Sequence, residues 1–435
     1  MHKALVLKIK RKSLAQWLIW CIIVLPFLFY LLFDLLKLPR FIMYSFDVCW
    51  MGLLMLNILT NKKAKPYDVR ALSTCIIIFL IYTAVNYIFN YQSIFYYIWG
   101  LRNNFRFYVF FLAVICYMNY EHIMDYLKMM DTLFWINAVV SLVQFYIFHK
   151  RGDHTGGLFG TTKGVNAYTI IFLSIVLSKS ILMYLRREER IELCLLKVAV
   201  ALVIIAHAEL KVSILILILV GGMALLLVNF SWRKLLIIAV GILAIIVGTT
   251  FIGRMFGDGS NSWFNLENLL ELAWSEKGYT QTGDLNRLAA IFQINKRFDF
   301  TWNEKLFGLG LGNCDTSSVS LFNTPFSSRY FSMHHTWFSI AMIYLETGYC
   351  GIIQYLGLFI LCYVLARKKK QERGNELYCM MAMIMAAVCC VLFPYNASLR
   401  VESGYMAYFI MALPFVYTNK GHVVKEIATA KEVES

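Results

Sequence analysis

The side chains best suited to chemistry in this sequence lie between residues 253 and 338. Arg287 and Arg297 precede a run of spaced glycines, and His334 and His335 follow it at the start of an apolar run. Arginine presents a planar fork of donors that matches phosphate oxygens and stays charged in any environment. Histidine can exchange a proton near neutral pH. Together these residues could hold a diphosphate leaving group and activate a hydroxyl.

A structural role is the alternative for the same residues. The arginines would then pair with acidic side chains and hold a loop together, and the histidines would mark a hydrated helix start. The acidic residues available for such pairs are Asp284, Asp299 and Glu304. Arg254 and Arg329 lie in the same stretch and are further candidates to bind an anionic substrate. Aromatic side chains also crowd this stretch, which suits either a membrane interface or sugar rings.

Other chemistries lack their usual motifs. Gly308, Gly310 and Gly312 look like part of a nucleotide-binding loop, but no strand pattern precedes them and no GK[ST] follows, so we expect a tight turn. The sequence contains no D-x-D motif and no His and Cys cluster with metal-ligand spacing. It therefore predicts neither a metal site nor a cofactor.

The composition identifies the scaffold that must position these residues. Of the 435 residues, 60% are hydrophobic and only 15% are charged, whereas about a quarter of the residues in soluble domains are charged. This composition predicts an all-α, polytopic membrane protein. The net charge of +15 does not indicate a nucleic-acid partner, because Lys and Arg fall mostly in short links between apolar runs, where they orient helices.

Apolar runs predict about twelve transmembrane helices, each on the order of 20 residues long. The predicted spans are 16–36, 41–60, 71–91, 104–119, 128–148, 165–185, 191–207, 212–230, 234–252, 336–365, 377–395 and 403–418. The chain is thereby divided into nine helices within residues 1–252, a large loop at 253–335, three helices within 336–418 and a tail at 419–435. The loop is predicted to be partly helical, over 260–273 and over 284–298 with Asp284 as the N-cap.

Charges in the links predict the orientation. Basic residues near the N-terminus and in alternate links follow the positive-inside rule, which places both termini in the cytoplasm and the 253–335 loop outside. The shorter outer links are then 91–106, 150–163, 207–211 and 396–402. These links carry cations against the usual bias, and the candidates among them to bind a diphosphate or glycan are Arg102, Arg106 and Lys211. His207, Glu209 and Lys211 form a titratable group at a predicted helix break, for which a plain helix end is the structural alternative.

Four motifs follow one another along this layout. They are GGLFGTTKGVNAY at 156–168, NRLAAI around Arg287, LFGLGLGN at 306–313, and HHTWF at 334–338 leading into IYLETGYCGI at 343–352. Their order, with the long outer loop, resembles the O-antigen polymerase and ligase superfamily. Members of that superfamily are bacterial membrane glycosyltransferases that use polyprenyl-diphosphate-linked glycans. The resemblance spans nearly the whole chain.

The resemblance implies metal-independent glycosyl transfer on the outer side of the cytoplasmic membrane. An Arg near position 287 would engage the diphosphate, and a His at the end of the loop would engage the acceptor hydroxyl. Family members commonly carry His-Asn where this chain has His334 and His335, which leaves open which histidine corresponds. A Ser-Arg pair often found on the central helix is matched here only by Lys211 with Ser213 nearby.

The sequence therefore favours a polymerase of lipid-linked oligosaccharide repeat units for an O-antigen, capsule or exopolysaccharide, in the bacterial inner membrane. Arg287, assisted by Arg297 or Arg329, would stabilise the diphosphate, and His335 or His334 would position or deprotonate the acceptor. Expected partners are the polyprenyl-diphosphate-linked oligosaccharide, membrane lipids and a chain-length regulator protein. A ligase that moves glycan to a lipid or protein acceptor shares these features. A transporter or flippase of lipid-linked sugars is the alternative from another class, although no pair of related halves is visible.

Overall fold

The computed structural model describes residues 2–59, 67–229, 231–239, 283–317, 319–370 and 376–416. Within these ranges the chain forms helices and turns but no β-strand, so the predicted all-α class is confirmed. Seven helices are long and apolar enough to cross a membrane. The chain therefore has the character of a multi-pass membrane protein.

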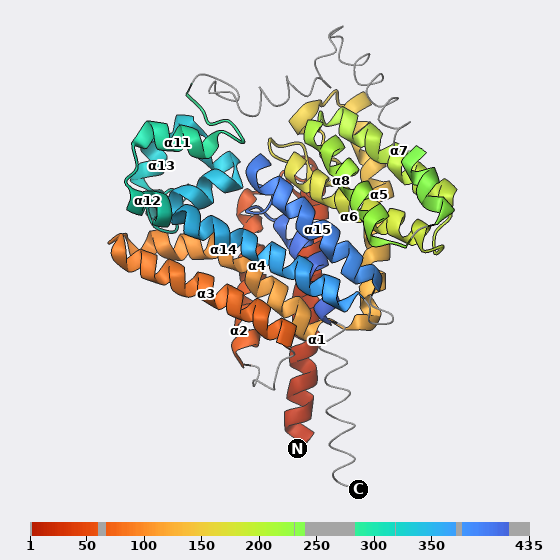
Figure 1. The fold of residues 1–435 in the computed structure, drawn as a ribbon, viewed down its shortest axis with the longest axis horizontal. Helices are drawn as coiled ribbons and strands as arrows, with labels where there is room; N and C mark the ends of the chain where they lie inside the picture. Colours follow the sequence, from red (N-terminus) through yellow and green to blue (C-terminus); the bar gives the residue numbers. More distant parts are fainter. Residues whose placement is uncertain are drawn as a thin grey trace.

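The helices follow one another with mostly short connections (Figure 1). The N-terminal part contains α1 (His2–Val24), α2 (Ser45–Leu59), α3 (Tyr67–Phe89), α4 (Ile94–Tyr117), α5 (Ile123–Tyr146), α6 (Asn166–Leu185), α7 (Ile191–His207) and α8 (Lys211–Leu227). The C-terminal part contains α11 (Ala290–Phe298), α12 (Trp302–Phe307), α13 (Pro325–Arg329), α14 (Ser339–Lys369), α15 (Glu376–Tyr395) and a last helix, Gly404–Val416. Between α1 and α2 lie a 3₁₀ turn (Leu25–Leu28), a π turn (Tyr30–Leu35) and a second 3₁₀ turn (Arg40–Tyr44).

The number of spans is established only in part. The seven candidate spans are Arg11–Leu28, Arg40–Ile58, Tyr67–Phe89, Tyr120–Tyr146, Asn166–Leu185, Ser339–Lys369 and Glu376–Tyr395. Val212–Leu227 and Gly404–Val416 are apolar but shorter. Most of the predicted span 234–252, the predicted helix 260–273 and the tail lie outside the described residues. Twelve spans and an outward-facing loop therefore stay predictions.

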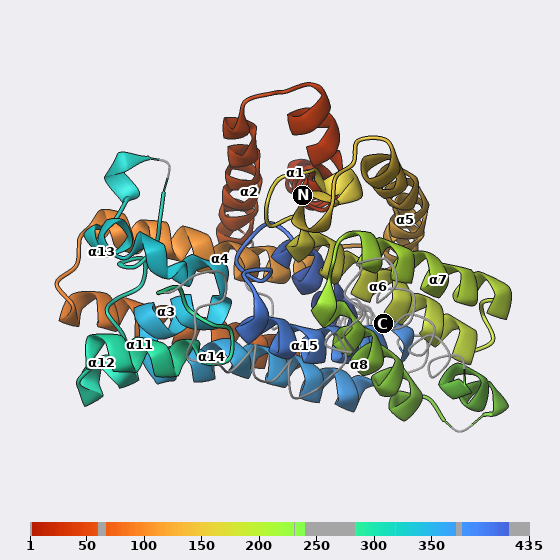
Figure 2. The same ribbon diagram turned by 90° about the horizontal axis from the view of Figure 1, so that it is seen from above.

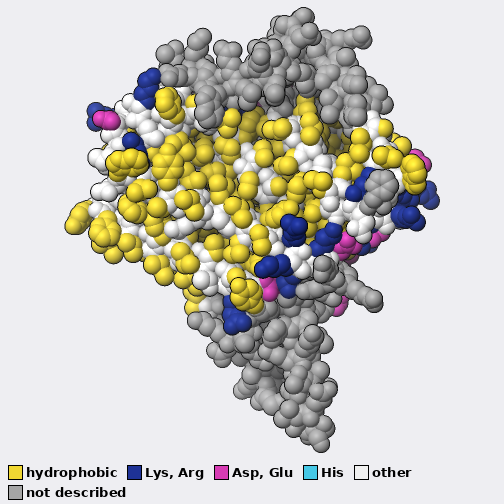
Figure 3. Space-filling model, in the orientation of Figure 1, with side chains coloured by type: hydrophobic (Ala, Val, Ile, Leu, Met, Phe, Trp, Pro, Cys, Tyr) yellow, Lys and Arg dark blue, Asp and Glu magenta, His cyan; other side chains and the backbone are white. Residues whose placement is uncertain are grey.

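Hydrophobic side chains cover the face of the bundle seen in Figure 3, and Lys and Arg gather mainly along its lower right margin. Ion pairs at the helix ends join links between spans. The alternation of the predicted spans assigns these links to the same side of the membrane. Lys369 Nζ lies 3.2 Å from Asp68, and Arg186 Nη1 lies 2.8 Å from Glu376. Three of the links predicted to face inward thus meet at one end of the bundle, because Lys369 and Glu376 flank the same link, and this is the arrangement that alternating spans require.

The predicted outer link at 91–106 is wrong in its extent. The chain turns at Tyr91, where φ is 46°, and α4 then runs without a break from Ile94 to Tyr117. Arg102 and Arg106 therefore lie on a helix, four residues apart and on the same face. Polar side chains are tolerated in an apolar bundle when they are paired, and both arginines are paired as described below.

The glycine run forms the tight turn expected from the sequence, and it packs against a kink in α14. The kink lies at Gly348 (φ 61°, ψ −163°), and the peptide nitrogens of Leu309 and Gly310 donate to the carbonyl oxygens of Leu345 and Glu346 at 2.8 and 3.0 Å. A Cβ on Gly308 would lie 2.4 Å from the nitrogen of Thr347. Such close backbone contact excludes any side chain there.

The helix predicted over 284–298 is shorter than expected. It begins at Ala290, with Ala289 rather than Asp284 at the capping position. Asp284 is buried and faces His334 instead. The predicted break between α7 and α8 is confirmed, because α7 ends at His207 and α8 begins at Lys211.

Candidate functional site

A cavity of about 690 Å³ opens between the α1–α2 connection, the 153–168 segment, the α7–α8 break, the Arg287 loop and the residues around α15. Its charged lining residues are Asp34, Arg40, Asp153, Lys163, Glu209, Arg287 and Glu402. Its aromatic lining residues are Phe29, Phe33, Phe159, Tyr168, Trp337, Phe338 and Tyr395. Concave sites with an aromatic lining and a few converging polar groups are the usual form of ligand sites.

Arg287, which the sequence predicted as a functional residue, lines this cavity. Its guanidinium carbon lies 3.9 Å from the centroid of the Tyr395 ring, which holds the planar fork against an aromatic face. The preceding turn is fixed by the side chain of Asn286, which accepts from the Arg287 nitrogen at 2.8 Å. Leu285 N also donates to Met333 O at 3.0 Å, which joins this turn to the histidine segment.

His334 adjoins the same cavity. Its ring stacks on Trp337, a cavity-lining residue, at 3.9 Å and 12°. Its Nδ1 lies 3.7 Å from the buried carboxylate of Asp284, a distance longer than a hydrogen bond. His334 is held in a left-handed conformation with φ 51°, which turns the chain into the short helix that contains Trp337.

His335 lies elsewhere. Its side chain is buried, its ring meets Phe326 edge-on, and its Nε2 donates to the carbonyl oxygen of Cys314 at 2.8 Å. Burial lowers the pKa of His335 from its usual value, so the ring is neutral at pH 7. The structure therefore separates the two histidines: His334 adjoins the cavity beside an acid, and His335 packs under the loop.

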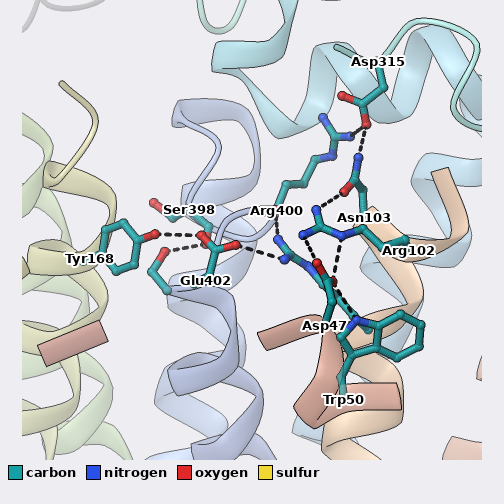
Figure 4. Close-up of polar contacts among 11 residues, drawn as sticks. Asp47, Trp50, Arg102, Asn103, Tyr168, Asp315, Ser398, Arg400 and Glu402 are labelled. Carbon is teal, nitrogen blue, oxygen red and sulfur yellow. Dashed lines mark hydrogen bonds and ion pairs between the residues drawn. The ribbon is translucent and has the colours of Figure 1, made fainter. Parts of the chain in front are cut away.

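A series of polar contacts, some fully and some partly buried, joins α2, α4, the Asp315 segment and the turn before the last helix (Figure 4). Arg102 makes two hydrogen bonds to Asp47, each 2.8 Å, and a third to Asn103, at 2.7 Å. Asn103 donates to Asp315 at 2.6 Å, and the same carboxylate oxygen accepts from Arg400 at 2.9 Å. Asp47, which lies within an apolar helix, is thus paired with Arg102. Arg102 takes part in this series of hydrogen bonds and does not line the cavity.

The series of hydrogen bonds continues through Arg106 to the cavity wall. Arg106 donates to Arg400 O and to Glu402, both at 2.9 Å, and the other carboxylate oxygen of Glu402 accepts from the Tyr168 hydroxyl at 2.8 Å. Burial alone would raise the pKa of Glu402, but Arg106 and the hydrogen bonds lower it by more, so the net shift is downward. Glu402 is therefore an ionised acceptor that faces the cavity, with Arg106 behind it.

Of the remaining sequence candidates, Arg297 and Arg329 do not line the cavity. Arg297 donates to Gly283 O at 2.9 Å, and Arg329 lies over the Tyr330 ring at 5.5 Å. Lys211 begins α8, and the position of its side chain is not described. Arg254 lies outside the described residues. A role for these four residues in binding substrate stays a prediction.

Sequence reasoning missed most of the cavity wall, including Arg40, Lys163, Tyr168, Tyr395 and Glu402. One sequence signal was available. The alternation of the predicted spans places the links that contain Lys163 and Glu402 on the same side of the membrane as Arg287. His207, singled out for its charge, is instead buried and stacked on Phe145 at 3.9 Å. Its neighbour Glu209 does line the cavity.

Among the described residues, no group of three or more His, Cys, Asp or Glu side chains is arranged to hold a metal ion. Neither a protein-family model nor a curated protein matches the sequence. The chemistry of the cavity is therefore the basis for assigning a function.

Proposed function

We propose that the protein polymerises polyprenyl-diphosphate-linked oligosaccharide repeat units at the outer face of the bacterial cytoplasmic membrane. The observation that carries the proposal is the position of Arg287. Its fork is held over Tyr395 in the wall of a cavity lined by aromatic rings and carboxylates. Aromatic faces and carboxylates suit sugar rings and their hydroxyls, and a guanidinium suits a diphosphate.

In the proposed reaction, a hydroxyl of one repeat unit attacks the anomeric carbon of a glycan carried on polyprenyl diphosphate. The new carbon–oxygen bond forms as the bond from the anomeric carbon to the diphosphate oxygen breaks, and polyprenyl diphosphate leaves with the bonding pair. Arg287 stabilises the negative charge that develops on the leaving group. His334 accepts the hydroxyl proton, and Asp284 stabilises the resulting imidazolium from 3.7 Å.

The Arg287→Lys variant tests the role of the fork. It keeps the charge but loses the two parallel donors and the flat contact with Tyr395. The variant is expressed in a strain from which the native gene has been deleted. We expect this strain to lose its repeat-unit ladders while the membrane level of the variant equals that of the wild-type protein. Arg233→Lys is the matched control, because Arg233 also lies over a tyrosine ring, that of Tyr184 at 5.0 Å, but does not line the cavity and should keep its ladders.

Purified protein in nanodiscs separates the polymerase from its alternatives. A polymerase converts lipid-linked repeat units alone into a ladder. A ligase requires a separate lipid or protein acceptor, and a flippase makes no new glycosidic bond. Metal independence is part of the proposal, so activity that chelator abolishes and divalent ions restore would contradict the mechanism.

A further inference from the structure

The connection between α1 and α2, residues 25–44, is an irregular elbow that we call the outer elbow. Pro26 occupies the start of the first 3₁₀ turn, where its missing N–H and fixed φ interrupt regular α-helix. The π turn and the second 3₁₀ turn then reverse the chain into α2. Figure 2 shows this elbow projecting beyond the other helices.

The outer elbow has two faces of different character. Its outward face exposes large apolar side chains, which are Leu31 (46%), Leu35 (55%), Leu36 (57%) and Phe41 (67%). Its inward face lines the cavity with Phe29, Phe33, Asp34, Arg40 and Met43. The elbow is therefore a thin wall between the apolar exterior and the polar cavity. Exposed leucines on a membrane protein are suited to contact with hydrocarbon chains.

A specific contact fixes the elbow to the 157–164 turn. Asp34 accepts from the nitrogen and the hydroxyl of Thr161, at 2.8 and 3.1 Å. The neighbouring Gly160 has φ 104°, and a Cβ there would lie 2.9 Å from Asp34 Oδ2, so the turn is shaped to receive this carboxylate. The contact places Arg40 and Lys163 on the two segments it joins, and both residues line the cavity.

Arg40 and Lys163 form no ion pair with any carboxylate in the part of the chain that the structure describes. Other cations of the bundle, including Arg102, Arg106, Lys179 and Lys369, do have acidic partners. Two cations without acidic partners, beside an apolar surface and at the rim of a cavity, match an amphiphile with a multiply charged phosphate head.

We propose that the outer elbow is the lateral opening through which a lipid-linked unit reaches the cavity, with Arg40 and Lys163 binding its diphosphate. The proposal rests on the proposed function for the choice of a polyprenyl diphosphate. The isoprenoid chain lies along the exposed leucines, and the sugar projects toward Tyr168 and Glu402. A phospholipid would satisfy the cations but leave the aromatic and carboxylate wall unused. Joining two lipid-linked units requires a second diphosphate site, and this one is separate from Arg287.

Binding measured without turnover tests the site. The full chain is placed in phosphatidylcholine nanodiscs and titrated with a C55 polyprenyl diphosphate. The double variant Arg40→Gln/Lys163→Gln should bind about tenfold more weakly or worse, because it loses two charge-assisted contacts. Lys37→Gln is the matched control: Lys37 lies on the same elbow and does not line the cavity, so binding should be unchanged. Equal binding by the wild type and the double variant would overturn the assignment.

Two further measurements identify the ligand. Inorganic pyrophosphate and phosphatidylglycerol nanodiscs should compete poorly, and full competition by either would overturn the requirement for a polyprenyl diphosphate. A benzophenone amino acid at Leu35 should crosslink to the bound C55 chain, whereas one at Val139, which is 61% exposed on α5, should not. Equal crosslinking at both positions would show that the elbow has no preference for the chain.

The two proposals fail separately. If deletion of the gene leaves ladders unchanged, the polymerase assignment falls, and weaker binding by the double variant still supports the opening. If Arg287→Lys abolishes ladders while Arg40→Gln/Lys163→Gln keeps both ladders and binding, the polymerase stands and the opening is refuted.

Discussion

Arg106 and Glu402 are 296 residues apart in the sequence and form a buried ion pair at 2.9 Å. The pair joins the middle of α4 to the turn before the last helix. Because Glu402 also faces the cavity and accepts from Tyr168, the fold and the candidate site share this one carboxylate. Substitutions there should report on both.

Glu402→Gln removes the charge that compensates Arg106. Leaving a buried guanidinium without its partner typically costs about 3–5 kcal/mol, so the unfolding temperature in detergent should fall markedly. Tyr168→Phe removes a single hydrogen bond to a charged group and should cost less, about 1.5–3 kcal/mol. A double variant, Arg106→Leu/Glu402→Leu, should recover part of the loss. Wild-type stability in Glu402→Gln would refute the importance of the pair.

The two histidines should differ in what their loss changes. His334→Asn should reduce polymerisation by about a hundredfold or more, which is the usual cost of losing a general base, with the protein level unchanged. His335→Asn removes a buried contact to Cys314 O and should lower protein level or unfolding temperature more than specific activity. Ladder formation normalised to membrane protein separates the outcomes. Full-length ladders from His334→Asn at normal expression would remove this histidine from the mechanism.

Stability should depend on pH through His335. Because burial lowers the pKa of its folded-state ring, the unfolded chain takes up a proton at a higher pH than the folded chain. The stabilising effect is therefore fully present above about pH 6.5 and is lost as the pH falls from there toward the folded pKa. Unfolding temperatures between pH 8 and pH 5 should show this decrease, and it should be smaller in His335→Gln. An equal decrease in both proteins would assign it to other groups.

The arrangement of the links predicts which positions are accessible from each side. Cysteine introduced at exposed Ser320 should react with an impermeant thiol reagent in intact spheroplasts. Cysteine at Glu188, beside Arg186, should react only after the membrane is permeabilised. A background without native cysteines gives the cleanest comparison, although Cys314 is buried and should react slowly. Labelling of position 188 from outside would reverse the predicted orientation.

Hydropathy predicted the fold class well, because the composition of long apolar runs is enough to identify helices that can lie in a membrane. It misjudged α4, where Arg102, Asn103, Asn104 and Arg106 lower the hydropathy of a continuous helix. Asp47 and Glu402 neutralise the two arginines, and Asp315 accepts from Asn103. These partners lie 55 to 296 residues away along the chain, so no local sequence pattern indicates them. The four-residue spacing of the two arginines was the available clue.

The candidate site was predictable in one part only. Residue type alone identified Arg287 and the histidine pair, because few residues suit phosphate binding and proton transfer. The sequence left open which histidine adjoins the cavity, since adjacent residues differ only in the direction of their side chains. Their separation depends on the left-handed conformation of His334, which no spacing rule specifies. Arg40 and Lys163 were not identified, because the turn that joins their segments depends on Asp34 and Gly160.

The distance along the chain between Arg106 and its acid sets an order of events during synthesis. At about 5–20 residues per second, a ribosome needs roughly 15–60 seconds to make the 296 residues that separate Arg106 from Glu402. During that interval α4 carries a guanidinium whose final partner does not yet exist. We therefore expect α4 to reach its place in the bundle only when the C-terminal helices arrive. Nascent chains that end before residue 402 should remain targets for membrane proteases however complete their first eight helices are.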